Sequence, residues 1–252
     1  MKLTVLGASG TYPRPGGATN GFLLQEGGTS LVVELGNGCL SNLLRELELT
    51  AIDAVVVTHM HIDHFGDLYS LFYALRFHPG EPWGLRLILP AGGIELMGRI
   101  LGEDSRDYLA RVFDAERLEA GREYRVGRMA MRAFPTRHPV EGYALRLEGE
   151  GWSVAYSSDS SPCPGLEEAA RGVDLFICEA TLPASYEKEA SHGHLTSRQA
   201  GETAARAGAR RLVLTHVWPT FDVVDIAREA QEAFTGEVLP AREGMTFSLG
   251  GG

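Results

Sequence analysis

The sequence predicts an α/β protein in which mixed β-sheets are flanked by helices. Short apolar runs of strand length alternate with amphipathic stretches of helical period, and glycine or proline separates most of them. The chain has 252 residues, of which 44% are hydrophobic and 22% charged, so it can bury a sizeable core. No linker, low-complexity tract or clear repeat divides the sequence, and we expect a single domain over residues 1–252.

The first half of the chain begins with strand patterns and then alternates them with helical patterns. Gly27 and Gly28 separate two of the apolar runs and are typical of a hairpin turn. Residues 93–118 are charged and have a helical pattern throughout. The other expected elements are strands at 2–7, 20–26, 29–35, 54–58 and 85–90 and helices at 37–48 and 67–77.

The second half returns to strands before the last helices. A helix after GHLT is expected to be capped by Thr196 or Ser197, whose hydroxyl can accept a backbone N–H. The expected elements are strands at 122–126, 129–134, 143–148, 152–157, 174–180, 211–216 and 245–249, and helices at 197–209 and 223–234.

Charge and cysteine content limit the classes of function. The net charge is −10, so the chain lacks the broad basic surface of a general nucleic-acid binder. The cysteines Cys39, Cys163 and Cys178 are widely spaced, which favours reduced thiols and a cytoplasmic protein. The N-terminal run MKLTVLG is too short for a signal peptide, and no stretch reaches membrane-spanning length, so no membrane partner is expected.

The segment VVVTHMHIDHFGD, residues 55–67, places three histidines and an aspartate directly after a predicted buried strand. Alternate residues of an extended segment share a face, so His59 and His61 can face one metal ion. The turn that follows presents Asp63 and His64 to a neighbouring position. Imidazole nitrogen and carboxylate oxygen suit Zn²⁺ and similar ions. The alternative is a polar loop in which Asp63 caps a helix.

Three further ligand candidates follow predicted strands later in the chain. His138, Asp159 and His216 each stand where a strand ends. Central strands deliver such residues to one sheet edge, where α/β active sites lie. Singly, each has an ordinary explanation as a loop or turn residue. With the histidine segment they complete a set that can hold two ions.

The early loop GASGTYPRPGGATNG, residues 7–21, is rich in glycine. It matches neither the dinucleotide-binding pattern nor the phosphate-loop pattern, and no good helix start follows it. We therefore expect it to border a site rather than to cradle phosphates.

The motif HMHIDH has the HxHxDH form of the metallo-β-lactamase superfamily, and His138, Asp159 and His216 follow in the order that this superfamily uses. The stretches LGASGTYP, HPVEGYALRL, YSSDSSPC, CEAT and GHLT resemble the ribonuclease Z branch and its short phosphodiesterase relatives over nearly the whole chain. The resemblance implies a four-layer αββα sandwich, in which two mixed sheets pack face to face with helices outside and the metals at one edge.

The resemblance also implies two divalent metal ions, in the first place Zn²⁺, with Mn²⁺ or Fe²⁺ as alternatives. Ions about 3.5–4 Å apart can share a hydroxide and clamp the attacking and leaving oxygens of a phosphodiester. A homodimer is compatible with it. The implied ligands are His59, His61 and His138 for one ion and Asp63, His64 and His216 for the other, with Asp159 bridging them.

Four residues are implied to act on the substrate. Glu179 and Thr181 in CEAT and His194 in GHLT match positions beside the scissile phosphate, and Asp63 is a candidate for proton transfer. His194 is placed to stabilise developing negative charge or to protonate the leaving alkoxide, with Glu179 orienting it. The alternatives are a strand-end residue for Glu179 and a helix-terminal contact for His194.

Two departures from the ribonuclease Z pattern bear on the substrate. Cys178 stands where that branch often has histidine, and no long basic arm for transfer RNA lies between His138 and Asp159 or elsewhere. With the acidic net charge, these favour a small anionic substrate, such as a cyclic or short nucleotide, over a nucleic acid.

We therefore predict a binuclear phosphodiesterase. The alternatives left open are a ribonuclease Z-type 3′ endonuclease on precursor transfer RNA, a hydrolase of esters, thioesters or lactones, and a metal-dependent ligand carrier without turnover.

Overall fold

Two seven-stranded sheets form the centre of the computed structural model, which describes residues 1–250 apart from the side chain of Asp104. The first sheet has the order β14-β1-β2-β3-β4-β5-β6. Its strands are β1 (Lys2–Gly7), β2 (Gly21–Glu26), β3 (Thr29–Leu35), β4 (Ala54–Val56), β5 (Leu85–Leu89), β6 (Phe113–Arg117) and β14 (Thr246–Ser248). The second sheet has the order β13-β12-β11-β10-β9-β8-β7. Its strands are β7 (Glu123–Val126), β8 (Met129–Pro135), β9 (Tyr143–Gly149), β10 (Trp152–Tyr156), β11 (Leu175–Glu179), β12 (Arg211–Thr215) and β13 (Glu237–Pro240).

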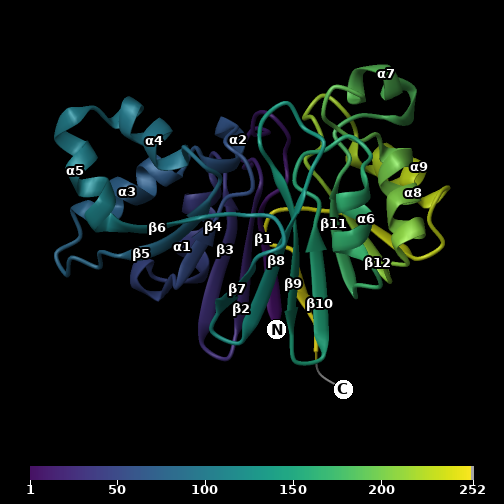
Figure 1. Cartoon of the computed structure of the whole chain (residues 1–252). Coiled ribbons are helices and arrows are strands. Elements are labelled where there is room, and N and C mark those ends of the chain that lie inside the picture. The colour runs from purple at the N-terminus through teal and green to yellow at the C-terminus, as the bar shows by residue number, and fades with distance from the viewer. Residues whose placement is uncertain (251–252) are drawn as a thin grey trace.

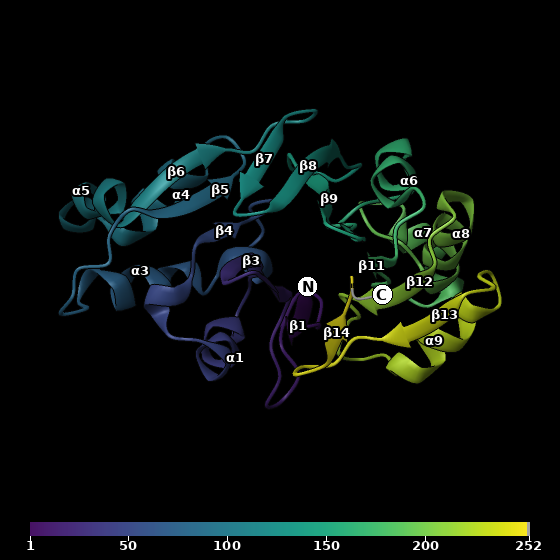
Figure 2. The same cartoon turned by 90° about the horizontal axis from the view of Figure 1, so that it is seen from below.

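Helices cover the outer face of each sheet (Figures 1 and 2). The first sheet is covered by α1 (Cys39–Glu46), α3 (Leu68–Arg76), α4 (Gly93–Leu101) and α5 (Glu103–Val112), and the second by α6 (Pro164–Ala170), α8 (Ser197–Ala207) and α9 (Val223–Gln231). The short helices are α2 (Ile62–Phe65), α7 (Glu187–Ala190), η1 (Leu49–Ala51) and η2 (Ala184–Tyr186). The predicted four-layer αββα sandwich is confirmed.

Each sheet changes from antiparallel to parallel pairing along the chain. In the first sheet β1, β2 and β3 are antiparallel and β3 to β6 are parallel. In the second, β7 to β10 are antiparallel and β10 to β13 are parallel. The two sheets therefore have the same order of antiparallel and then parallel pairing along the chain, although the sequence has no clear repeat. β14 pairs with β1 and joins the end of the chain to the first sheet.

Alternating side chains of the central strands fill two different cores. In β3, Leu31 and Val33 face the second sheet and pack in one cluster with its Leu145. Val32 faces the other way and packs with the helical residue Leu43. Because successive strand residues point to opposite faces, a continuous apolar run is required wherever a strand is covered on both sides.

The structure corrects the prediction of helix over residues 93–118. The helical pattern is right up to Val112, but residues 113–117 form β6. β6 has the charged composition of an edge strand, because Asp114 is exposed and Glu116 pairs with Arg86. Such a sequence is easily taken for the exposed surface of a helix. The edge strand β13 and helix α6, which begins at Pro164, were not predicted from the sequence.

The predicted cap of the helix at 197–209 is Thr196. Its side chain accepts the backbone N–H of Gln199, whose own side chain accepts from Thr196 N, which completes a capping box. Among the described residues, no helix is both long and apolar enough to cross a lipid bilayer.

Neighbouring leucines in α1 provide a matched test of the helix-side core. Leu43 is 0% exposed and Leu44 is 45% exposed. We expect Leu43→Ala to lower the free energy of unfolding by about 2–5 kcal/mol, because it leaves a cavity. Leu44→Ala is expected to change it by less than about 0.5 kcal/mol. Urea unfolding followed by circular dichroism measures both; equal losses would contradict the packing described.

Candidate metal centre

The predicted metal ligands lie together at one edge of the sandwich, after the ends of strands from both sheets. The segment after β4 supplies one half of the set from the first sheet, and the segments after β8, β10 and β12 supply the other half from the second. The first half is His59, His61, Asp63 and His64, and the second is His138, Asp159 and His216. The centre therefore forms only where the two sheets pack against each other.

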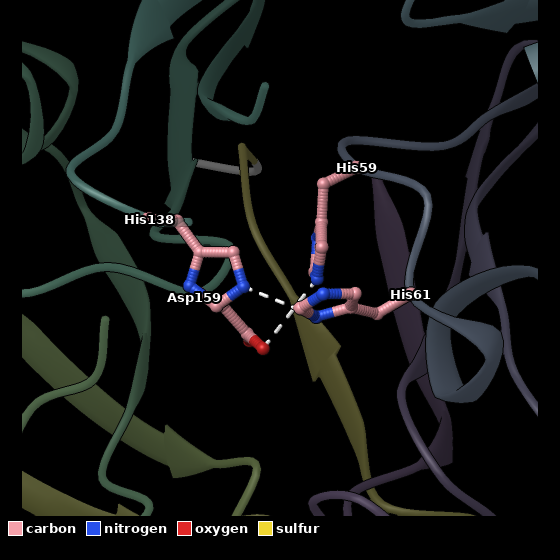
Figure 3. Close-up of side chains that lie close together, drawn as sticks. All are labelled: His59, His61, His138 and Asp159. Atoms are coloured by element: carbon pink, nitrogen blue, oxygen red, sulfur yellow. Dashed lines mark hydrogen bonds and ion pairs between the residues drawn. The ribbon is translucent and has the colours of Figure 1, made fainter. Parts of the chain in front are cut away.

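The first group consists of His59, His61, His138 and Asp159, whose ligand atoms all lie within 4.8 Å of one another (Figure 3). His138 Nε2 lies 3.1 Å from His61 Nδ1, and His59 Nε2 lies 3.5 Å from Asp159 Oδ2. The two histidines that alternate along the extended segment do face one point, as the spacing predicted.

The second group consists of Asp63, His64 and His216, also within 4.8 Å of one another. His216 Nε2 lies 3.1 Å from Asp63 Oδ2. Asp159 Oδ2 lies 3.4 Å from both His64 Nε2 and His216 Nε2. The same carboxylate oxygen thus contacts histidines of both groups.

These groups fit divalent cations. His59 Nε2, His64 Nε2 and Asp159 Oδ1 are buried without a hydrogen-bond partner, although buried polar atoms nearly always have one. Burial and the neighbouring His64 hold the pKa of His59 well below its ordinary value, which favours the neutral ring that binds metals. Nitrogen and oxygen donors of this kind suit zinc, manganese or iron.

A buried polar layer that sequence reasoning missed holds the rings of His59 and His64. Glu34 is 0% exposed, and its Oε1 lies 3.3 Å from His64 Nδ1. It also accepts the hydroxyl of Thr58, whose Oγ1 lies 2.6 Å from Ser158 Oγ. Ser158 Oγ in turn lies 3.3 Å from His59 Nδ1. The available signal was an acidic residue inside the apolar run TSLVVEL.

The rings of His216 and His138 are held in the same way. His216 Nδ1 lies 2.8 Å from Thr181 Oγ1, which donates to Glu179 Oε2 at 2.5 Å. His138 Nδ1 lies 2.9 Å from the Gly193 carbonyl. In these four of the five histidines of the set, Nδ1 faces protein and Nε2 faces the centre, the arrangement by which outer partners fix the tautomer of metal-binding histidines. His61 differs, because its Nδ1 lies 3.1 Å from His138 Nε2.

The residues predicted to act on the substrate differ in their access to it. Glu179 and Thr181 are both 0% exposed, so they contact other side chains rather than the opening. The His194 side chain is 22% exposed, and its Nδ1 lies 3.3 Å from Glu179 Oε1. Burial alone would lower the pKa of His194, but the Glu179 carboxylate outweighs it and raises the pKa to about 9.

The early loop borders the centre, as its composition led us to expect. The Thr11 N–H donates to Asp63 Oδ2 at 2.8 Å. A Cβ on Gly10 would lie 2.4 Å from the His216 carbonyl oxygen, so only glycine allows this approach. Helix α2 has no side-chain cap, and the carboxylate of Asp63 instead accepts from Thr11. The capping alternative for Asp63 is therefore wrong.

Backbone strain gathers at the same place. Five non-glycine residues among residues 1–250 have positive φ, and four of them belong to the centre or contact it. They are Thr11 at 65°, Glu34 at 60°, Ser158 at 55° and His216 at 56°. Such conformations cost about 1–3 kcal/mol each and are concentrated at functional sites.

Comparison with known proteins agrees with this geometry. A family model described as a beta-lactamase superfamily domain matches residues 35–217. The chain belongs to the metallo-β-lactamase superfamily. A probable metallo-hydrolase of this superfamily, YhfI of Bacillus subtilis, is 33% identical over 252 residues, which cover 98% of this chain and 99% of YhfI. The crystal structure of YhfI superimposes with a TM-score of 0.88 at 30% identity, covering 98% of each chain.

Ribonuclease Z proteins of the superfamily are also similar to this chain. Ribonuclease Z of Mycolicibacterium paratuberculosis is 30% identical over 245 residues, which cover 87% of this chain and 86% of that protein. The short form of human tRNase Z has the same fold, with a TM-score of 0.80 at 22% identity over 99% of each chain. The chain is therefore a metallo-hydrolase-like member of the superfamily with relatives in the ribonuclease Z branch.

Thr181 allows a direct test of how the centre is held. Thr181→Val keeps the shape of the side chain and removes the hydroxyl beside His216 Nδ1. We expect it to weaken zinc binding about tenfold to a hundredfold, because the ring loses the partner that orients it. Competition with a chromophoric chelator measures the affinity.

Thr203→Val is the matched control for this experiment. It removes another buried threonine hydroxyl, which donates to the Gln199 carbonyl in α8. Zinc affinity should be unchanged in this control and recovered in Thr181→Ser. Wild-type affinity in Thr181→Val would show that the hydroxyl does not position His216.

Proposed function

We propose that the protein is a binuclear metal-dependent phosphodiesterase that acts on small phosphodiesters such as cyclic or short nucleotides. His59, His61 and His138 would hold one ion, Asp63, His64 and His216 the other, and Asp159 would bridge them. The observation that carries the proposal is the pair His194–Glu179, which lies beside this ligand set and reaches solvent through the histidine. A site that only stores or carries metal does not need such a pair.

Two divalent ions, most simply Zn²⁺, would supply positive charge and Lewis acidity for the attack of water on phosphorus. The protein groups have separate tasks around that step. Glu179 holds His194 Nδ1, so that Nε2 is the nitrogen available to a ligand. When the phosphorus–oxygen bond breaks, His194 would give its proton to the leaving alkoxide or hydrogen-bond the charged phosphoryl oxygen. Asp63 combines its role as a ligand with proton acceptance from the attacking water.

The burial of Glu179 and Thr181 makes them positioning residues in this proposal. Glu179 contacts His194 directly and reaches His216 through the hydroxyl of Thr181. One carboxylate thus orients both a ligand and the residue that meets the leaving group.

The preference for small substrates is supported by the connections around the centre. Residues 136–142 form a short link between β8 and β9, closed by the hydrogen bond from Thr136 N to the Gly142 carbonyl. Neither this link nor any other described segment extends as a basic arm that could grip transfer RNA. With a net charge of −10, the chain offers few remote contacts for a polyanion.

Metal content tests the ligand assignment. We expect two divalent ions per chain after metal loading and dialysis, measured by elemental analysis. Asp159→Ala should lose both ions, because its carboxylate contacts histidines of both groups. His138→Ala should retain one. A single ion in the wild type, or equal occupancy in the two variants, would contradict the shared carboxylate.

His194 tests the chemistry. We expect His194→Ala to lower kcat for 2′,3′-cyclic AMP about a hundredfold or more while both metals stay bound. The loss should be smaller for bis-p-nitrophenyl phosphate if His194 is a proton donor, because p-nitrophenolate leaves without protonation. His192→Ala, two positions away and exposed, is the control.

The substrate class is tested on the same protein. The expected result is hydrolysis of small diesters with weak dependence on salt. Efficient, salt-sensitive cleavage at the 3′ end of precursor transfer RNA, with poor turnover of small diesters, would instead establish the ribonuclease Z alternative. Turnover of thioesters or lactones alone would overturn the phosphodiesterase proposal.

A further inference from the structure

Large apolar side chains stand exposed next to the candidate centre. Tyr12 is 47% exposed, Ile62 52% and Val140 37%. They come from three separate segments: the early loop, the start of α2 and the link between β8 and β9. Single exposed apolar residues are ordinary, but here three separate segments that border the centre each expose one, which points to a binding surface.

A hydrogen bond joins the chain neighbours of Tyr12 and Ile62. The N–H of Thr11 donates to Asp63 Oδ2 at 2.8 Å. Tyr12 follows the donor residue and Ile62 precedes the acceptor. Both therefore stand beside a proposed ligand of the second metal ion.

Val140 lies in the link between β8 and β9, which contacts the histidine segment. His59 and Gly142 form an antiparallel bridge, and continuing this register places Val140 opposite His61. The contact of 3.1 Å between His138 Nε2 and His61 Nδ1 holds the two segments together at this point. Figure 1 shows the loop between β8 and β9 and the loop after β1 rising at the same upper edge as α2.

We propose that Tyr12, Ile62 and Val140 form an apolar rim that binds the organic group of the substrate, in particular a nucleobase. The inference rests on the proposed function and specifies its substrate as a nucleoside phosphodiester. A phosphate at the metal centre leaves its ester groups at the opening, beside these side chains. The rim offers an aromatic face and two aliphatic side chains and carries no charge. Bases of any sequence stack on such surfaces, since every base has a π-face.

A pair of diesters with the same leaving group isolates the rim. Thymidine 5′-(p-nitrophenyl phosphate) and methyl p-nitrophenyl phosphate both release p-nitrophenol and differ in the nucleoside. The measured quantity is the ratio of their kcat/KM values. We expect the wild type to favour the thymidine ester, and Tyr12→Ala to lower this ratio about tenfold or more, as the loss of one stacking partner predicts. Ile62→Ser should lower it less.

Tyr73→Ala is the matched control, because Tyr73 lies in α3 and is 41% exposed, close to the exposure of Tyr12. Its ratio should equal that of the wild type. If both esters are hydrolysed and neither Tyr12→Ala nor Ile62→Ser lowers the ratio, the rim inference is wrong and the proposed function stands. If neither ester is hydrolysed by the metal-loaded wild type, both are overturned.

A second copy of the chain is the other possible occupant of the rim. Sedimentation of the wild type and of Tyr12→Ala distinguishes it. A dimer that dissociates in the variant, with no change in the substrate ratio, would make the rim a subunit interface and overturn its role in binding substrate.

Discussion

The contact of one carboxylate oxygen with three imidazoles is the interaction on which the candidate centre depends. Asp159 Oδ2 lies within 3.5 Å of a nitrogen of His59, His64 and His216. The first two follow a strand of the first sheet, and Asp159 and His216 follow strands of the second. The contact can form only when the apolar core between the sheets fixes their separation, so packing far from the centre determines its geometry.

Burying this many polar groups has a cost that the protein offsets locally. Isolated carboxylates and unpaired imidazole nitrogens are unfavourable away from water. An outer layer of polar side chains offsets part of this cost. Glu34 and Glu179 contact the histidine rings on the side away from the centre, directly or through the hydroxyl of Thr58 or Thr181. His59 Nε2, His64 Nε2 and Asp159 Oδ1 nevertheless remain buried without a hydrogen-bond partner. Their remaining need for a partner is the physical reason to expect cations there.

The sequence was sufficient to predict which residues gather at the candidate centre, because their signal is local and repeated at strand ends. Three histidines and an aspartate in one short segment are a strong signal for metal binding. His138, Asp159 and His216 are predicted because residues that follow central strands lie at one edge of the sheet. Glu34 was missed, because a lone acidic residue in an apolar strand can also be a strand-end residue in solvent. Only the register that places β3 beside β4 brings it to Thr58 and His64.

Edge strands were harder to predict than central ones for a related reason. A central strand that is buried on both faces needs a continuous apolar run. β6 and β13 lie at the sheet edges, pair with one strand each and carry charged residues. Charged patterns of that kind also suit a helix surface or a loop. The pairing partner, which is the preceding strand and lies beyond at least one helix for both β6 and β13, decides the conformation, and the pattern of a short segment does not contain that information.

In the two proposals, different parts of the site recognise the charge and the organic group of the substrate. In the proposed function, the bound cations would attract an anion to this centre although the chain as a whole is acidic, so a phosphate group would fix where a substrate binds. Next to it, Tyr12, Ile62 and Val140 present neutral apolar surface, on which affinity comes from contact area and stacking rather than from phosphate charge. Long polyanions gain little from such a rim beyond the first residue, whereas a single nucleoside fills it. The same arrangement would account for the proposed preference for small diesters without any element that excludes larger ones.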